Sequence, residues 1–323
     1  MKRSGALGLV IAITSTLGFS TSGTLAKPLL ETGWSPAAVV VLRALLGGLI
    51  LLPFAIRALK GNWRTAWTGR WRILGMGAAG VAGTQLLYFT ALQTVAVSTT
   101  LLIEFLSPVL LVLVAWVLSR RVPARPVLLG SLLAIGGLVL VIGPGALVAP
   151  DLRGVVCAFG AMVGCAVYFV VAARDARGLP SIALASFGLL LGAIVLAPFA
   201  MLGVFPVAIS SADVVVWGMA APWWAPVILV AIIPTAFAYV AGITGTQLLG
   251  SRIGSFVGLL EVVFASALAW LFLGQALTAV QLLGGAVLVA GIIAVRAGAD
   301  RRLVAEIATV DELARRELPI SAA

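Results

Sequence analysis

Residues 259–292 read LLEVVFASALAWLFLGQALTAVQLLGGAVLVAGI, two apolar runs in which Glu261 is the one charged residue. About 20 residues of α-helix cross the hydrocarbon core of a bilayer. Together with the residues that flank it, the stretch accommodates two such helices, at 253–273 and 277–295, joined by a short link that begins at Gly274. The stretch therefore predicts a pair of membrane-spanning helices.

The same pattern recurs along the whole chain. Of the 323 residues, 62% are hydrophobic and 10% are charged, whereas roughly a quarter of the residues in soluble domains are charged. We therefore expect an all-α integral membrane protein with multiple passes through the cell (cytoplasmic or inner) membrane. Its ten predicted transmembrane helices lie at residues 6–24, 37–56, 73–91, 97–118, 127–144, 154–173, 181–203, 222–244, 253–273 and 277–295.

The net charge of +10 could indicate nucleic-acid binding, so the positions of the 21 basic residues are decisive. In the ten-helix arrangement all of them except Lys27, Arg43 and Arg153 fall on one side of the membrane. By the positive-inside rule that side is cytoplasmic, and it holds both termini. Attraction to anionic lipid headgroups accounts for the remaining basic character. We expect the lipid bilayer and a small-molecule solute as partners, and no nucleic acid.

Catalytic and metal-binding residue types are scarce. The sequence contains no histidine, which excludes histidine-based catalysis and histidine metal sites. Cys157 and Cys165 lie on one apolar run without the spacing of a metal site or of a disulfide within one helix. We expect two free thiols, no cofactor, no metal and no enzymatic activity. The beginning, MKRSGALGLVIAIT, is similar to a secretory signal, but its apolar run is too long for one, so it is predicted to be the first spanning helix.

The two halves of the chain repeat each other at an offset of 154 residues. Gln93 then aligns with Gln247, Ala115-Trp116 with Ala269-Trp270, and Gly137 with Gly291. Because each half holds an odd number of spans, the second half is predicted to lie upside down relative to the first, as in many secondary transporters. The predicted units are a five-helix repeat at 1–145, a second five-helix repeat at 150–296 and a cytoplasmic tail at 297–323.

Two further stretches resemble a known family. They are VVVLRALLGGLILLPF at 39–54 and STTLLIEFLSPV at 98–109, and together with the stretch at 259–292 they resemble the EamA family of the drug/metabolite transporter superfamily over about residues 6–296. The resemblance implies two inverted five-helix repeats around a central cavity, and the export or import of small metabolites, commonly amino acids. The sequence departs from the family pattern at Val262, where the family usually has proline, and at Gln275 and Arg121, where it often has glutamate.

Three ionisable residues lie well inside predicted spans, where a charge costs a few kcal/mol and indicates function. Arg43 and Glu104 each lie about 10 Å below the outer edge, at 1.5 Å of rise per residue. Either they form a structural ion pair, or a zwitterionic solute bridges them, with its carboxylate on Arg43 and its ammonium on Glu104. Glu261 has no obvious basic partner in the sequence, and it is either a proton-coupling site or a neutral acid that holds helices together.

Uncharged residues complete the candidates. Two tyrosines lie on spans three and eight, Tyr88 and Tyr239, and two glutamines lie at the ends of these spans, Gln93 and Gln247. For each of them, contact with the solute and a role in helix packing are equally open. Pro108 and Pro234 would interrupt helical hydrogen bonds and are the candidate hinges. The first span is rich in serine and threonine, so part of it should face protein or water. Trp63, Trp67 and Trp71 are spaced four residues apart among arginines, a pattern typical of an amphipathic helix at the membrane interface.

A secondary transporter, more specifically an exporter of a small polar metabolite, is the function favoured by these features. The alternatives are an ion channel and a membrane-embedded enzyme. A channel usually forms rings of polar groups by oligomerisation, and no filter-like segment is present in the sequence. An embedded enzyme would require clustered nucleophiles, metal ligands or paired acids. The sequence leaves open whether the protein is a monomer or a homodimer.

Overall fold

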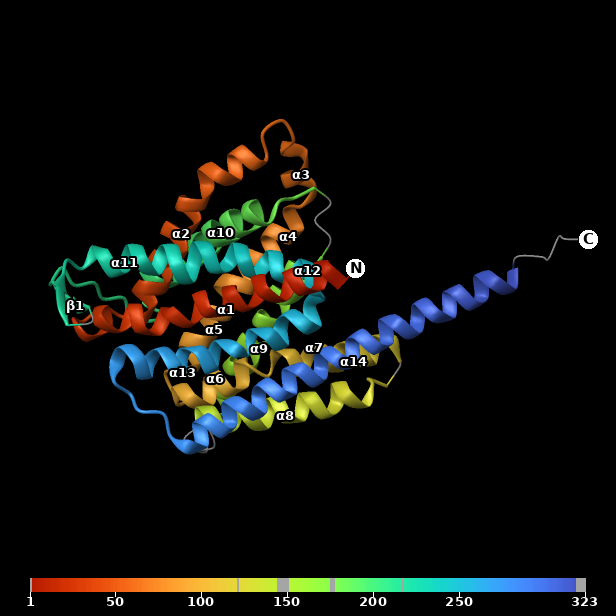
Figure 1. The fold of residues 1–323 in the computed structure, drawn as a ribbon. Helices are drawn as coiled ribbons and strands as arrows, with labels where there is room; N and C mark the ends of the chain where they lie inside the picture. Colours follow the sequence, from red (N-terminus) through yellow and green to blue (C-terminus); the bar gives the residue numbers. More distant parts are fainter. Residues whose placement is uncertain (1, 121, 144–150, 175–177, 217, 318–323) are drawn as a thin grey trace, which may run out of the picture.

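The computed structural model describes residues 2–120, 122–143, 151–174, 178–216 and 218–317, and the side chains of all of these except 2–4, 98 and 299–317. The described chain is almost entirely helical (Figure 1). Its elements are α1 (Lys2–Glu31), α2 (Pro36–Ala58), α3 (Trp63–Thr68), α4 (Arg70–Leu74), η1 (Gly75–Gly83), α5 (Thr84–Ala91), α6 (Val97–Glu104), α7 (Ser107–Ser119), α8 (Arg125–Ile142), α9 (Leu152–Ala173), α10 (Ser181–Met201), β1 (Val214–Val216), β2 (Met219–Ala221), α11 (Trp224–Ala231), η3 (Ile232–Phe237), α12 (Ala238–Gly258), α13 (Leu260–Leu273) and α14 (Ala279–Glu317).

Nine helical segments of the described chain are long and apolar enough to cross a membrane, and Leu260–Leu273 is a shorter apolar helix. The expected boundary between spans eight and nine is different in the structure. The segment from Trp224 to Gly258 is helical throughout except at Gly250, where φ is +80° and ψ is 161°. Glycine has no Cβ and adopts this conformation without steric cost. The chain therefore changes direction at the single residue Gly250. The sequence predicted a longer link there, from 245 to 252.

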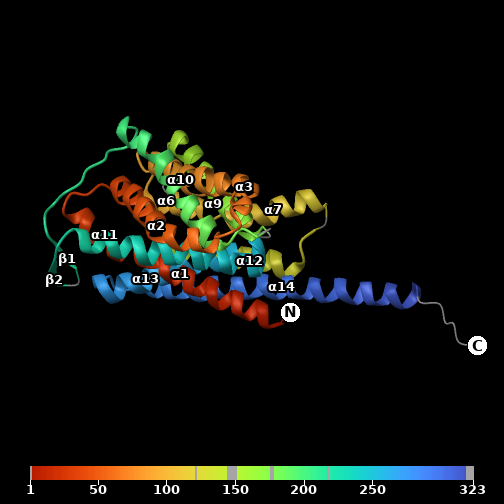
Figure 2. The same cartoon turned by 90° about the horizontal axis from the view of Figure 1, so that it is seen from above.

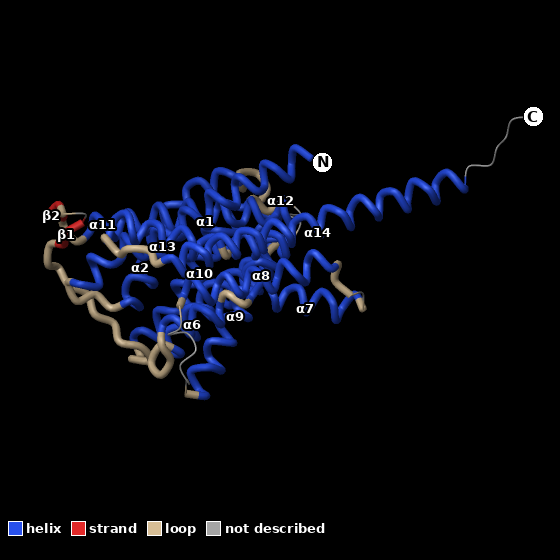
Figure 3. The backbone as a smooth tube through the Cα atoms, turned by 60° about the horizontal axis from the view of Figure 1, so that its bottom comes forward, coloured by secondary structure: helices blue, strands red, loops and turns tan. Residues whose placement is uncertain are grey.

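The spanning helices lie roughly along one common direction (Figures 1 and 2). Helix α1 begins at the same end of the bundle as the one from which α14 projects, and the β1–β2 hairpin lies at the opposite end (Figure 3). Helix α14 continues far beyond the bundle, so part of the predicted tail, up to Glu317, is helical. The hairpin, which pairs Val214–Val216 with Met219–Ala221 in antiparallel register, is a small addition to the expected all-helical fold.

Helices from the two halves of the chain pack mainly on each other. In the first half, α1 packs on α11, η3, α12 and α13, and in the second half α9 packs on η1, α5, α6 and α7. Helix α2 packs on α10, and α8 packs on α14. Each of these contacts joins helices that occupy equivalent or reciprocal places in the two predicted repeats. The core therefore lies between the halves, and neither half encloses a core of its own.

Glycines allow the closest of these contacts. A Cβ on Gly137 of α8 would lie 2.6 Å from the Gly284 backbone oxygen of α14 and would also clash with the Leu288 backbone nitrogen. Real side chains cannot occupy such space, so the two backbones touch because both helices have glycine there. Glycines of the tenth predicted span thus allow α14 to pack closely on α8.

Three spans contain breaks in their regular hydrogen bonding. Span three passes through the π-helical segment η1, and span eight passes through the π-helical segment η3, which contains Pro234. Span four is interrupted at Phe105 and Leu106, and α7 then begins with Ser107 and Pro108. Both predicted proline bends therefore coincide with real irregularities. Whether they move as hinges is still a prediction.

Tryptophans at the two ends of the bundle differ in their surroundings. Trp63, Trp67 and Trp71 are exposed, and the Arg70 guanidinium lies over the Trp67 and Trp71 rings at 5.1 and 5.5 Å. This fits a segment at the membrane interface. Trp34 does not behave as an interfacial residue, because it is 3% exposed and its Nε1 donates to the Ser210 carbonyl oxygen at 2.7 Å.

Candidate functional site

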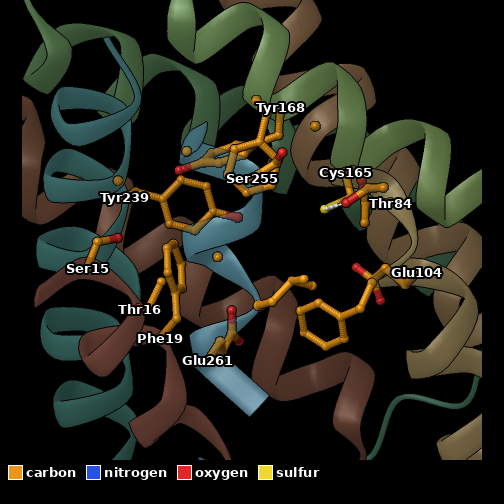
Figure 4. Close-up of a pocket in the computed structure, with 18 of the residues that line it drawn as sticks. Ser15, Thr16, Phe19, Thr84, Glu104, Cys165, Tyr168, Tyr239, Ser255 and Glu261 are labelled. Carbon is orange, nitrogen blue, oxygen red and sulfur yellow. Dashed lines mark hydrogen bonds between the residues drawn. The ribbon is translucent and has the colours of Figure 1, made fainter. Parts of the chain in front are cut away.

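A cavity of about 240 Å³ lies in the middle of the bundle, and we refer to it as the central cavity. Helices from both halves of the chain enclose it, chiefly α1, η1, α5, α6, α9, α12 and α13 (Figure 4). A cavity bounded by two repeats at the depth of the spanning helices is the usual location of a solute site in secondary transporters. Charged, aromatic and hydroxyl side chains all contribute to its lining.

The three ionisable residues singled out in the sequence all line the central cavity. Arg43 comes from α2, Glu104 is the last residue of α6, and Glu261 lies in the first turn of α13. Figure 4 shows the Glu104 and Glu261 carboxylates reaching into the space from different helices. Packing of helices from the two halves of the chain brings these residues, far apart in sequence, to one cavity.

Arg43 and Glu104 do not form the direct ion pair that was one of the two expectations. In the part of the chain that the structure describes, no ion pair within 4.0 Å joins Arg43 to Glu104 or to Glu261. All three side chains face the same cavity, Arg43 and Glu104 from the first half of the chain and Glu261 from the second. Equal depth in the membrane does not reveal which helices are neighbours, so the sequence did not show that Glu261 faces the same cavity as Arg43 and Glu104.

Aromatic side chains form one wall of the central cavity. The Tyr239 ring meets Phe19 edge-on at 5.2 Å between centroids and Tyr168 at 5.8 Å. The Tyr168 hydroxyl is buried and has no hydrogen-bond partner among the described residues. Tyr168 was absent from the sequence-based candidates, although a signal was available: the chain has three tyrosines, and Tyr88, Tyr168 and Tyr239 all line this cavity.

Small hydroxyl groups supply most of the remaining polar surface. Ser15, Thr16 and Ser22 of α1 line the central cavity, which confirms that part of this polar span faces away from lipid. The Ser15 hydroxyl donates to the Ala238 carbonyl oxygen at 2.7 Å, next to the π-helical segment η3. On the opposite side, the Ser107 hydroxyl donates to the Cys165 sulfur at 3.3 Å. These contacts hold the lining in place.

Gln93 and Gln247 lie outside the lining of the central cavity. The Gln93 Nε2 donates to the Val204 carbonyl oxygen at 3.1 Å, and the Gln247 Oε1 accepts from the Ser181 hydroxyl at 2.9 Å. Each glutamine thus ties its helix to a neighbouring segment. The geometry favours helix packing, one of the two roles that the sequence left open for them.

The fold and the central cavity together indicate the class of protein. Apolar helices of spanning length around a central polar cavity are the architecture of a multi-pass membrane transport protein. A family model described as the EamA-like transporter family matches residues 6–143 and 152–297. The chain belongs to the EamA-like transporter family and is a membrane transporter.

Two relatives agree with this assignment. An "Uncharacterized transporter" from Archaeoglobus fulgidus is 24% identical over 273 residues, which are 84% of this chain and 90% of the relative. The "Uncharacterized transporter YwfM" of Bacillus subtilis is 25% identical over 295 residues, or 90% of this chain and 94% of the relative. A solved structure described as "Crystal structure of protein" is similar in fold, with a TM-score of 0.70, 21% identity, and coverage of 89% of this chain and 96% of that one.

Proposed function

We propose that this protein is a secondary transporter that exports a small polar metabolite, such as an amino acid or a related compound, by alternating access of the central cavity. The observation that carries the proposal is the set of three charged side chains, Arg43, Glu104 and Glu261, which face one cavity without an ion pair between them in the described chain. Unpaired charges inside a membrane protein are costly and are kept where a solute or ion uses them.

The charge arrangement suits a zwitterion. A solute carboxylate can accept a bidentate pair of hydrogen bonds from the Arg43 guanidinium. A solute ammonium can lie between Glu104 and Glu261, which come from different halves of the chain. Because Arg43 and both glutamates line one cavity of about 240 Å³, both solute groups would sit close together, as they do in an α-amino acid. This refines the bridge between Arg43 and Glu104 by adding the second carboxylate.

We further propose ten spans in two inverted repeats, with both ends in the cytoplasm. The kink at Gly250 supports this count, because it separates the long segment from Trp224 into two helices, the second of which leads into α13. The shared end of the bundle for α1 and α14 supports an even number of spans (Figure 1). The basic residues concentrated at that end support the cytoplasmic assignment.

A growth-rescue screen tests the proposal and identifies the solute class. Cells that express the protein are challenged with toxic concentrations of individual amino acids and their analogues. We expect rescue by the wild-type protein against a defined subset of them, and no rescue by Arg43→Ala. Arg57→Ala, which alters an exposed arginine outside the cavity, is the matched control and should rescue fully. Rescue by Arg43→Ala at the wild-type level would show that this site is not used.

A further inference from the structure

A second cavity of about 660 Å³ lies beside the central cavity, toward the end of the bundle that carries the β1–β2 hairpin, and we call it the outer cavity. Helices α6, α8 and α13 and the link before α14 line it, mostly with aliphatic side chains. It shares three lining residues with the central cavity: Leu101, Phe105 and Glu261. The two spaces are therefore neighbours, and these three side chains lie at the boundary between them.

Phe105 lies at the break in span four, and Leu101 lies about one turn before it, on α6. Helix α6 ends at Glu104, Phe105 follows outside the helix, and α7 begins at Ser107. Pro108 has no N–H group to donate to the Glu104 carbonyl oxygen, and its ring would crowd that oxygen in a continuous helix. The eight residues of α6 thus form a short segment that can shift on its neighbours α8 and α9 without unwinding a whole span.

Charge differs on the two sides of this boundary. Arg43 and Glu104 line the central cavity alone, whereas Glu261 lines both. Among the described residues that line the outer cavity, Glu261 is the one with a charge. A cation that moves outward therefore remains beside a carboxylate during the whole crossing. An anion without an ammonium group would leave Arg43 and meet negative charge with no positive group to replace it.

We propose that Leu101 and Phe105 form a gate between the central and outer cavities, and that an ammonium-bearing solute crosses this gate along Glu261. The inference rests on the proposed transport function and deepens it, because it gives the solute an exit route and gives that route a preference for amines. Phe105 blocks the passage sterically, and displacement of α6 opens it. Glu261 holds the ammonium group from one side of the gate to the other.

Native Cys165 makes the gate measurable without knowledge of the solute. It lines the central cavity, whereas Ser266 lines the outer cavity alone. In a Cys157→Ser background, a membrane-impermeant trimethylammonium methanethiosulfonate is added to the face of the membrane that carries the hairpin. We expect slow modification of Cys165, and a rate about ten-fold higher in Phe105→Ala, as follows when roughly 1.4 kcal/mol is removed from a barrier. A Ser266→Cys variant that lacks both native cysteines should react rapidly with or without Phe105.

Matched variants separate the gate from a general loosening of the fold. Phe54→Ala removes a phenylalanine that is exposed on α2 and lines neither cavity, so Cys165 should react as slowly as in the parent. Phe105→Leu should keep most of the block, and Leu101→Ala should accelerate labelling as Phe105→Ala does. Thermal unfolding of each purified variant identifies any that are misfolded. Equal Cys165 labelling rates in the parent, Phe105→Ala and Leu101→Ala would overturn the gate.

A sulfonate methanethiosulfonate of the opposite charge tests the role of Glu261. For each reagent, the rate of Cys165 modification in the Phe105→Ala background is divided by the rate at which the introduced thiol of the Ser266→Cys variant is modified. We expect this ratio to be higher for the cationic reagent than for the anionic one. Glu261→Gln should reduce this preference by several-fold, roughly the effect of one unit charge at partly screened distances. An unchanged preference would overturn the route along Glu261. Labelling requires no transport, so gated labelling in a protein without solute counterflow would contradict the transport function and leave the gate standing.

Discussion

Arg43, Glu104 and Glu261 place one positive and two negative groups around a cavity in the interior of a membrane protein. A direct Arg43–Glu104 pair would have favoured a structural role, since the two charges would have neutralised each other between helices. The described structure has no ion pair between Arg43 and either glutamate. The geometry therefore leaves the charged groups available to a solute.

Removal of the Arg43 side chain should weaken solute binding more than it weakens the fold. A hydrogen bond to a charged group contributes about 1.5–3 kcal/mol, so Arg43→Ala should raise the apparent Kd of a carboxylate solute roughly ten- to a hundred-fold. Arg43→Lys, which keeps the charge but loses the bidentate geometry, should fall between. Equilibrium binding of radiolabelled solute to the purified protein measures the affinity. Wild-type affinity in both Arg43→Ala and Glu104→Gln, with folding intact, would contradict the bridging of a zwitterion.

Glu261 is the residue at which proton coupling should be visible. If the carboxylate exchanges a proton for the solute ammonium, an imposed pH gradient should accelerate transport by the wild-type protein and have no effect on Glu261→Gln. Asp213→Asn, an exposed position near the hairpin, is the control and should retain the wild-type response. Transport in vesicles with and without the gradient provides the measurement. A gradient response that persists in Glu261→Gln would leave the neutral, helix-holding role for this residue.

At the scale of elements, the contact between α8 and α14 depends on glycine. Gly137→Ala would place a methyl group against the Gly284 oxygen and the Leu288 backbone, and such overpacking costs about 1–3 kcal/mol. Gly136 is the matched control, because a Cβ there would meet no atom within 4 Å. We expect a lower thermal unfolding midpoint in detergent for Gly137→Ala and no decrease for Gly136→Ala. Equal midpoints would mean that the helices separate there at little cost.

The irregular elements were only partly predictable. Pro108 and Pro234 indicated where spans four and eight depart from regular helix, because proline lacks an N–H donor. The π-helical segment η1 contains no proline and was not expected, although its glycines, among them Gly75, Gly77 and Gly80, marked the place. The Thr84 hydroxyl donates to the Ala79 oxygen at 3.0 Å, the same oxygen that accepts the Thr84 backbone N–H across the wider turn. Such a bond depends on backbone geometry and leaves no pattern in the sequence.

For the whole molecule, the periodic apolar runs predicted the helical membrane fold, because bilayer thickness fixes the length of each run. The ionisable residues of the site were equally predictable, since charge is rare inside a span. Two features were not predictable in this way. The shared cavity of Glu261 and Arg43 and the position of Tyr168 both depend on which helices pack together. Helix packing in an apolar chain is decided by contacts between residues far apart in sequence.

Reporter fusions test the orientation of the bundle across the membrane. Green fluorescent protein fused after α14 should fluoresce, and alkaline phosphatase inserted at Ile209, near the hairpin, should be active, because the two sites lie at opposite ends of the bundle. The concentration of basic residues places the α14 end in the cytoplasm. Fluorescence and phosphatase activity in whole cells are the measurements. Inactive phosphatase at Ile209 in a fusion that is stably inserted would reverse the proposed orientation.

The central claim is that the cavity between the two halves carries a solute in alternating access. Purified protein in liposomes preloaded with the solute found by the growth screen should drive transient uphill entry of the labelled solute, and this counterflow should saturate with concentration. Arg43→Ala should lose the counterflow, and Arg57→Ala should retain it. A flux that rises linearly with concentration, without transient accumulation, would indicate a channel and contradict the account.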